Sequence, residues 1–152
     1  MFRKAVWEDR ETVYRFICDM EERQLPFQRF SQIFQRQLEN ENYCCLIDQR
    51  GGQPVAILNL RFEEQLHHGD RVAEIMEFVA DPRHRGNGIG GRLFAHACQV
   101  ARDHGCSQIE VACNQLRTDT HRFYTRQGMH NFHFKFSKVL MGEDPPENRI
   151  GR

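Results

Sequence analysis

Two amphipathic helices are predicted in the first third of the chain, because apolar residues recur there every three or four positions. The first stripe covers residues 7–20, and the second begins at Pro26 and extends to Asn40. Residues 1–6 precede them and are apolar at alternate positions, which predicts a short strand. The chain therefore opens with a strand followed by two helices.

Short runs rich in Val, Ile and Leu predict strands in the middle of the chain. Residues 43–48 and 54–62 are separated by the turn Arg50-Gly51-Gly52, so together they read as a hairpin. Residues 71–79 resume the strand-like pattern and end before the break at Asp81-Pro82.

The last third of the chain alternates between helical and strand-like patterns. Residues 90–104 carry one apolar face and predict a helix, residues 107–113 alternate as a strand does, and residues 119–127 predict a short helix. Three phenylalanines then alternate with polar residues within 132–140, which predicts a terminal strand. The resulting order, β-α-α-β-β-β-α-β-α-β, predicts an α/β fold with a mixed sheet flanked by helices.

Length and composition narrow the class of protein. A chain of 152 residues fits one domain, which we place at residues 1–141, with residues 142–152 as a flexible tail. Lys plus Arg equals Asp plus Glu at 21 each, so no overall positive charge favours a nucleic-acid partner. The N-terminus lacks the apolar region of a signal peptide and no segment has 18 consecutive apolar residues, so we expect a cytoplasmic protein without a membrane partner.

The six cysteines show no C-x-x-C spacing, and several lie at apolar positions, as reduced buried thiols do. We therefore expect no disulfides.

The run from Arg85 to Gly90, Arg-Gly-Asn-Gly-Ile-Gly, carries the strongest chemical signal in the chain. Glycines before a helix allow a ligand to approach the backbone, and the free amides and positive dipole end of the helix favour an anion such as a pyrophosphate. A P-loop would need Lys and then Ser or Thr where Gly91-Arg92 stands, and a dinucleotide fingerprint would need G-x-G-x-x-G. The alternative is a glycine-rich turn without a ligand.

The chain resembles the GNAT superfamily of acetyl-CoA-dependent N-acetyltransferases over nearly its whole length. The glycine run matches the family's R/Q-x-x-G-x-G/A loop, and Glu77-Phe78-Val79 matches the strand before it. Asn114, Tyr124 and Gly128 are similar to the family's N-x(6)-A-x-x-Y-x-x-G-F segment, although His121 stands for its Ala and Met129 for its Phe. The resemblance implies the GNAT fold, with a mixed, mostly antiparallel central sheet.

The resemblance also implies which residues hold acetyl-CoA. The loop amides bind the pyrophosphate, the backbone of the preceding strand binds the pantetheine arm and polarises the thioester carbonyl, and Asn114 offers its amide, unless that side chain only closes a turn. The cofactor-binding residues expected from the resemblance are Phe78, Val79, Arg85, Gly86, Asn87, Gly88, Ile89, Gly90, Gly91, Asn114 and Tyr124.

Acetyl transfer to an amine needs a base for the ammonium proton and an acid for the departing thiolate. Glu77 is our first candidate for the base and Glu74 the second, with solvent-facing strand positions as the alternative for both. Residues three apart in a regular strand face opposite sides, but members of the superfamily often carry a β-bulge here that turns both toward the cleft. Tyr124 matches the family's general acid, the alternative being a packing role.

A narrower resemblance is to the aminoalkylphosphonate N-acetyltransferases. It rests on Leu66-His67-His68, on Glu74-Ile75 with Glu77, and on His121-Arg122-Phe123-Tyr124 followed by His133-Phe134. Those enzymes act on an anionic acceptor and are associated with a divalent metal. This implies an acceptor site for the phosphonate formed by the cationic side chains Arg61, Arg71, His67 and His68.

The residues alone leave several alternatives open. Surface histidines explain His67 and His68 as well as a metal site does, because no i,i+4 histidine pair or Cys/His cluster is present. The acceptor is a small primary amine, with an aminoalkylphosphonate as the first choice and another small amine, an aminoglycoside or a protein N-terminus as alternatives. A non-catalytic acetyl-CoA-binding module is the alternative of another class. The terminal strand either packs on the helices or joins a second chain in a homodimer.

Overall fold

The computed structural model describes residues 1–143 of the chain. These residues form two compact units, Met1–Ala112 and the residues from Cys113 onward. The assignment of residues 1–141 to one domain stays a prediction, and most of the predicted tail, residues 144–152, lies outside the described residues.

The first unit is built on a five-stranded sheet in which the strands follow one another in sequence order, β1-β2-β3-β4-β5. The first three pairings are antiparallel, and only β4 and β5 run parallel. The strands are β1 (Phe2–Lys4), β2 (Tyr43–Arg50), β3 (Gln53–Gln65), β4 (Asp70–Ala80) and β5 (Gln108–Val111). This confirms the mixed, mostly antiparallel sheet of the GNAT fold.

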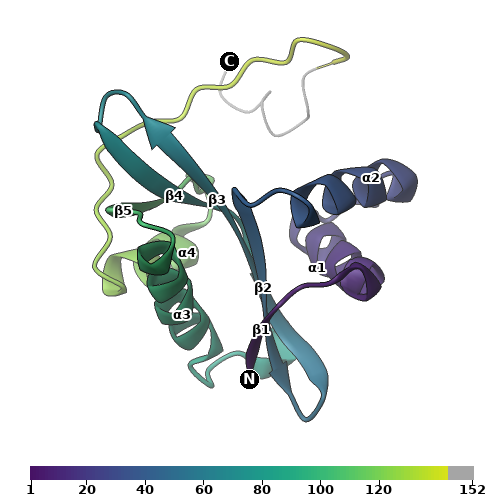
Figure 1. Cartoon of the computed structure of the whole chain (residues 1–152). Coiled ribbons are helices and arrows are strands. Elements are labelled where there is room, and N and C mark those ends of the chain that lie inside the picture. Colours follow the sequence, from purple (N-terminus) through teal and green to yellow (C-terminus); the bar gives the residue numbers. More distant parts are fainter. Residues whose placement is uncertain (144–152) are drawn as a thin grey trace. The chain divides into compact units, whose positions relative to one another are not determined.

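Helices cover both faces of this sheet (Figure 1). Helices α1 (Arg10–Glu21) and α2 (Phe27–Leu38) lie on one face, and α3 (Ile89–Asp103) lies on the other. Two 3-10 turns, η1 (Trp7–Asp9) and η2 (Pro82–His84), precede α1 and α3. No helix within residues 1–143 combines the length and hydropathy that a membrane span requires.

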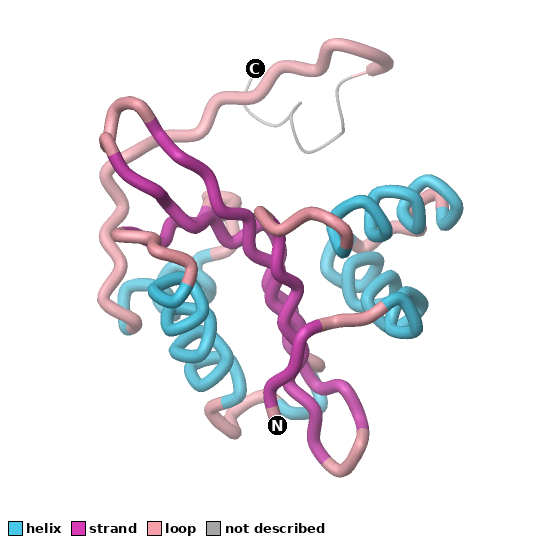
Figure 2. The backbone as a smooth tube through the Cα atoms, in the orientation of Figure 1, coloured by secondary structure: helices cyan, strands magenta, loops and turns pink. Residues whose placement is uncertain are grey.

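Strand β3 is the centre of the core because helices cover both of its faces. Every residue from Val55 to Leu60 is buried, so the apolar run is continuous instead of alternating. On one side, Ile57 joins Val13, Ile17 and Phe34 of α1 and α2. Figure 2 shows β3 and β4 side by side between the helical layers. The core thus holds β4, which carries the candidate catalytic carboxylates, and β3, which carries their partners.

A β-bulge interrupts the pairing of β3 with β4. Asn59 pairs with Glu77 and Leu60 with Ile75, so Met76 has no counterpart on β3. One extra residue reverses the alternation of faces beyond it. Glu74 and Glu77 are paired with Arg61 and Asn59, which are two residues apart on β3 and share one face. The predicted bulge is therefore confirmed, and it turns both carboxylates to the same face.

The predicted strand over residues 132–140 is wrong for the described part of the chain, where no strand follows β5. Alternating Phe132, Phe134 and Phe136 favour an extended segment, but a strand forms only when its backbone pairs with a neighbour. These three side chains are 82%, 77% and 93% exposed. The second unit, from Cys113 onward, contains the short helix α4 (Thr118–Arg126).

Candidate active site

Two carboxylates of β4 lie on the sheet face that α1 and α2 cover, and each has a different partner. Glu74 Oε2 accepts a 2.6 Å hydrogen bond and ion pair from Arg61 Nη2, which also contacts Glu63 Oε1 at 3.4 Å. Glu77 Oε2 instead accepts a 2.9 Å hydrogen bond from the neutral amide of Asn59. Glu74 is therefore held in an ion pair, whereas Glu77 accepts its hydrogen bond from a neutral group.

The surroundings of Glu77 favour a higher proton affinity. Burial raises the pKa of Glu77, the hydrogen bond from Asn59 opposes that rise, and the nearby carboxylate of Glu21 adds to it. A carboxylate with a raised pKa is a stronger base than an exposed glutamate, which is the direction that general-base catalysis at neutral pH requires.

The end of β4 separates from β5 just where the bulge occurs. Pairing of β4 with β5 covers Val72 to Ile75, whereas pairing with β3 continues to Ala80. From Met76 onward, β5 therefore no longer accompanies the edge of β4 on that side. Phe78 and Val79, the residues predicted to contact the pantetheine arm, lie in this stretch.

The glycine run forms the turn between η2 and α3. Gly86 and Gly88 have φ of +81° and +70°, a conformation that L side chains rarely adopt, and Gly88 is the N-cap of α3. The first helical hydrogen bond of α3 runs from Arg92 N to Gly88 O. Helix geometry therefore leaves the amides of Ile89, Gly90 and Gly91 without an intrahelical acceptor. The loop fits a pyrophosphate at a helix N-terminus.

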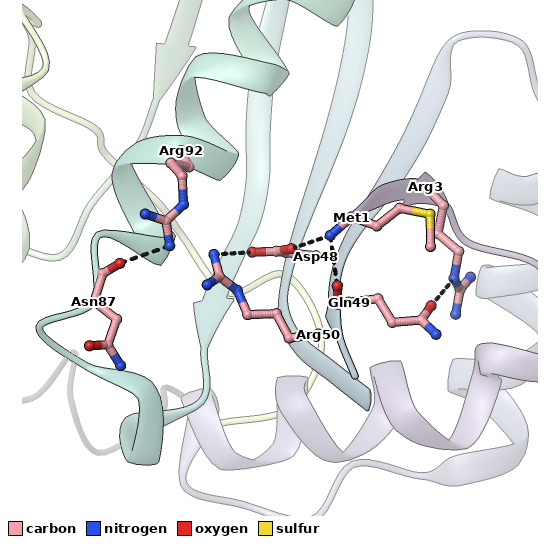
Figure 3. Close-up of polar contacts among 7 residues, drawn as sticks. All are labelled: Met1, Arg3, Asp48, Gln49, Arg50, Asn87 and Arg92. Atoms are coloured by element: carbon pink, nitrogen blue, oxygen red, sulfur yellow. Dashed lines mark hydrogen bonds and ion pairs between the residues drawn. The ribbon is translucent and has the colours of Figure 1, made fainter. Parts of the chain in front are cut away.

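Arg92 closes the loop from the first turn of α3 (Figure 3). Its Nη2 donates to Asn87 O at 2.8 Å, and a Cβ added at Gly88 would approach its Nη1 to 3.2 Å. Arg92 thus stabilises the loop conformation that the glycines permit.

The same view shows the buried carboxylate of Asp48 between the N-terminal amine of Met1 and the guanidinium of Arg50, at 3.4 Å and 3.6 Å.

Asn114 and Tyr124 belong to the second unit. The Asn114 Oδ1 accepts a 2.9 Å bond from Leu116 N and closes a turn, which is the structural role considered above. Tyr124 is buried, and burial, followed by the nearby Cys113 thiol, raises its pKa to about 12 against a smaller opposing effect of Arg117. The Tyr124 phenol is therefore protonated at neutral pH, as a general acid must be.

The four cationic candidates for an acceptor site do not converge. Arg61 shares its face with Glu77, whereas Arg71 stacks over Phe62, which lies on the opposite face because it directly follows Arg61. Arg71 Nη2 donates instead to Asn42 Oδ1 at 3.0 Å. His67 and His68 lie together in the exposed β3–β4 turn, with ring centroids 4.3 Å apart.

A resident metal does not fit the described donors. Within residues 1–143, no group of three or more His, Cys, Asp or Glu side chains is placed to hold an ion. His67 and His68 provide only two such groups, and His68 Nδ1 is already 2.5 Å from Gln65 Oε1. We therefore assign no step of the chemistry to a metal.

Sequence reasoning missed Asn59, which contacts Glu77, and Gln37, which contacts Asn59. Asn59 and Gln37 line a cavity of about 370 Å³ at the C-terminal end of α2, and Asn59 bridges Gln37 and Glu77. The available signal was a lone polar residue inside the apolar run of β3, since a buried amide needs partners. Gln37 gives no signal, because its role depends on how α2 packs.

Comparison with known proteins now decides the family. The model of the acetyltransferase (GNAT) family matches residues 4–129, which is most of the chain. The chain belongs to the GNAT acetyltransferase family. As a member of this family, it is an acetyl-CoA-dependent N-acetyltransferase.

The proteins similar to this GNAT enzyme are named for different activities. It is 37% identical over 138 residues to an aminoalkylphosphonate N-acetyltransferase of Salmonella typhimurium, covering 91% of this chain and 90% of the relative. A transcriptional regulator from Bacillus halodurans has a TM-score of 0.85 at 23% identity, covering 92% and 99% of the chains. An aminoglycoside acetyltransferase from a soil metagenomic sample, in complex with sisomicin, has a TM-score of 0.79 at 17% identity, covering 93% and 96%. The two structures share the fold.

Proposed function

We propose that this enzyme transfers the acetyl group of acetyl-CoA to the primary amine of an aminoalkylphosphonate. The observation that carries the proposal is the 37% identity to the Salmonella typhimurium aminoalkylphosphonate N-acetyltransferase over 91% of the chain. An enzyme of this kind is favoured over a non-catalytic acetyl-CoA-binding module, because the family and the named relative are both acetyltransferases.

We assign the proton transfers to Glu77 and Tyr124. Glu77 accepts the proton of the acceptor ammonium, so that the amine nitrogen can attack the thioester carbonyl, with C–N bond formation and C–S bond cleavage. Tyr124 donates its phenolic proton to the departing thiolate and is reprotonated by the second proton that the attacking nitrogen loses, so the amide product is neutral. The raised pKa of Glu77 supports its role as the base, and the pKa of about 12 keeps the Tyr124 phenol protonated and so available as a donor. Glu74 remains the second candidate base.

Acetyl-CoA fits the first unit at two places. The amides at the start of α3, with Arg85, Gly86 and Asn87 before them, suit the pyrophosphate, and the backbone of Phe78 and Val79 suits the pantetheine arm and the thioester carbonyl. In the second unit, Asn114 is kept as a further contact through its amide nitrogen, since its oxygen already closes a turn.

Arg61 is the best placed of the four cationic candidates for the phosphonate. It shares a face with Glu77, and a phosphonate would compete with Glu63 and Glu74 for its guanidinium. His67 and His68 are kept as contacts from the hairpin turn. Arg71 is the weakest candidate because it stacks on the opposite face.

We also propose a homodimer that uses the segment with Phe132, Phe134 and Phe136, because large exposed apolar side chains are typical of association surfaces. A cytoplasmic location and the lack of nucleic-acid and membrane partners stay predictions from composition.

Thiol release from acetyl-CoA tests the acceptor. We expect turnover with 2-aminoethylphosphonate and much less with ethylamine and β-alanine, which present the same amine without the phosphonate. Good turnover of an aminoglycoside or an N-terminal peptide, with none of the aminophosphonate, would reject the choice of acceptor.

The same assay tests the two catalytic assignments. Glu77→Gln and Tyr124→Phe should each lower kcat by roughly 10²–10⁴, the range typical of general acid–base catalysis. Tyr14→Phe is the matched control, because the Tyr14 hydroxyl donates to Leu25 O within the helical layer and should leave kcat unchanged. Wild-type rates in either test variant would remove that residue from the mechanism.

A further inference from the structure

A chain of side-chain hydrogen bonds connects helix α2 to Glu77 through the central strand. The Nδ2 of Asn59 donates to Gln37 Oε1 at 3.0 Å and to Glu77 Oε2 at 2.9 Å. Gln37 comes from α2, Asn59 from β3 and Glu77 from β4, so the hydrogen bonds connect side chains of three different elements.

The orientation of the Asn59 amide follows from its partners. An ionised carboxylate only accepts hydrogen bonds, so the end of the amide that faces Glu77 must be the nitrogen. Both hydrogens of that nitrogen are then used, one on Glu77 and one on Gln37. The Oδ1 of Asn59 is buried and has no hydrogen-bond partner among the described residues. A buried oxygen left unpaired is unfavourable, so the orientation that serves Glu77 lowers the stability of the fold.

The other groups around Glu77 do not stabilise its charge. From α1, the Glu21 carboxylate raises the pKa of Glu77, as burial does, and only the Asn59 hydrogen bond lowers it among the effects resolved for this group. From β2, the Cys45 thiol is neutral, since burial and the charge of Glu77 raise its pKa to about 12. On its own strand, Glu74 is held by Arg61.

We propose that Asn59, held in place by Gln37, is a positioning residue that orients the Glu77 carboxylate and favours its ionised form. This inference rests on the proposed role of Glu77 as the base. Without the amide, Glu77 would keep its proton to a higher pH and would no longer be fixed relative to the acceptor amine.

The pH dependence of kcat/KM tests the proposal, because its acid limb reports the pKa of the base in the free enzyme. Asn59→Leu removes the donor at similar volume and should move the acid limb to higher pH. Asn59→Asp places a second carboxylate against Glu77 and should move it further in the same direction. A shift of about one pH unit is about a tenfold loss of kcat/KM below both limbs, with recovery at higher pH.

Gln37→Leu tests the same relay from α2, where the substitution is more easily accommodated than inside the sheet. It should produce a smaller shift in the same direction, whereas Gln35→Leu, which removes only an exposed contact to Glu39 on the same helix, should produce none. The Gln37 and Asn59→Asp variants keep the test valid even if Asn59→Leu does not fold.

The Glu77→Gln variant separates the two proposals. If Glu77 is not the base, this variant keeps the wild-type acid limb, and the proposed function of Glu77 fails. If the limb is lost in Glu77→Gln but stays at the wild-type pH in the folded Asn59 and Gln37 variants, only the positioning role is overturned. A purely structural role of Asn59 would lower kcat/KM equally at all pH values and leave the limb in place.

Discussion

Asp81 shows how a single side chain holds the turn that leads into the glycine loop. Its carboxylate accepts hydrogen bonds from Arg83 N at 2.9 Å and from the Arg83 guanidinium at 2.6 Å, which fixes the η2 turn directly before Arg85. The side-chain hydrogen bond from Arg83 is the main reason that the pKa of Asp81 falls to about 2. The folded protein therefore stabilises the ionised form of the Asp81 carboxyl group more than the unfolded chain does.

Asp81→Asn should lower the thermal midpoint most at neutral pH. The stabilisation by a carboxylate with a lowered pKa is complete above its ordinary pKa of 3.8 and is lost as the pH falls toward about 2. The difference between wild type and variant should therefore shrink between pH 4 and pH 2. Asp19→Asn, at an exposed position of α1, is the control and should show no such trend. A difference that stays constant with pH would contradict the assignment.

At the scale of elements, the conformation of the glycine loop and the first turn of α3 depends on glycine at positions 86 and 88, which both have positive φ. Gly88→Ala places a side chain at φ of +70° and within 3.2 Å of the arginine that holds the loop. Such a conformation costs about 1–3 kcal/mol, so the loop should relax and weaken acetyl-CoA binding roughly tenfold.

Gly105→Ala is the matched control for this prediction. Gly105 follows the other end of α3 at φ of +77°, and a Cβ there meets nothing within 4 Å. Both variants should lose similar thermal stability, but only Gly88→Ala should raise the Kd for acetyl-CoA in calorimetric titration. Equal Kd values for the two variants would mean that the loop conformation does not control binding.

The bulge at Met76 is the element-scale feature that determines which face the carboxylates use. It was expected from the family resemblance, since nothing in the local sequence distinguishes Met76 as an extra residue. The row of Gln37, Asn59 and Glu77 could not be predicted, because Asn59 and Gln37 are 18 and 40 positions from Glu77. The three residues come together only through the sheet register and the packing of α2. Arg61 and Arg71 were predicted together, but the strand alternation separates them.

At the scale of the whole molecule, the segment of three alternating phenylalanines predicts self-association. If wild type forms a dimer through this segment, changing Phe132, Phe134 and Phe136 together to Ser should give a monomer in light scattering. Changing the intervening His133, Lys135 and Ser137 to Ala should leave the dimer intact, because alternate residues of an extended segment face the other side. A monomeric wild type, or a Ser variant that stays dimeric, would reject the proposal.

The sequence by itself determined the family, the order of the elements up to α4 and the location of the glycine loop before α3. These features depend on local periodicity, on glycines at positive φ and on a short motif, all of which are encoded within a few residues of each other. Only the tertiary structure decided that Glu74 and Glu77 share a face, that Glu77 is held by Asn59, and that residues 132–140 do not form a strand in the described chain. The physical reason is that burial, ladder register and backbone pairing are set by residues distant in sequence.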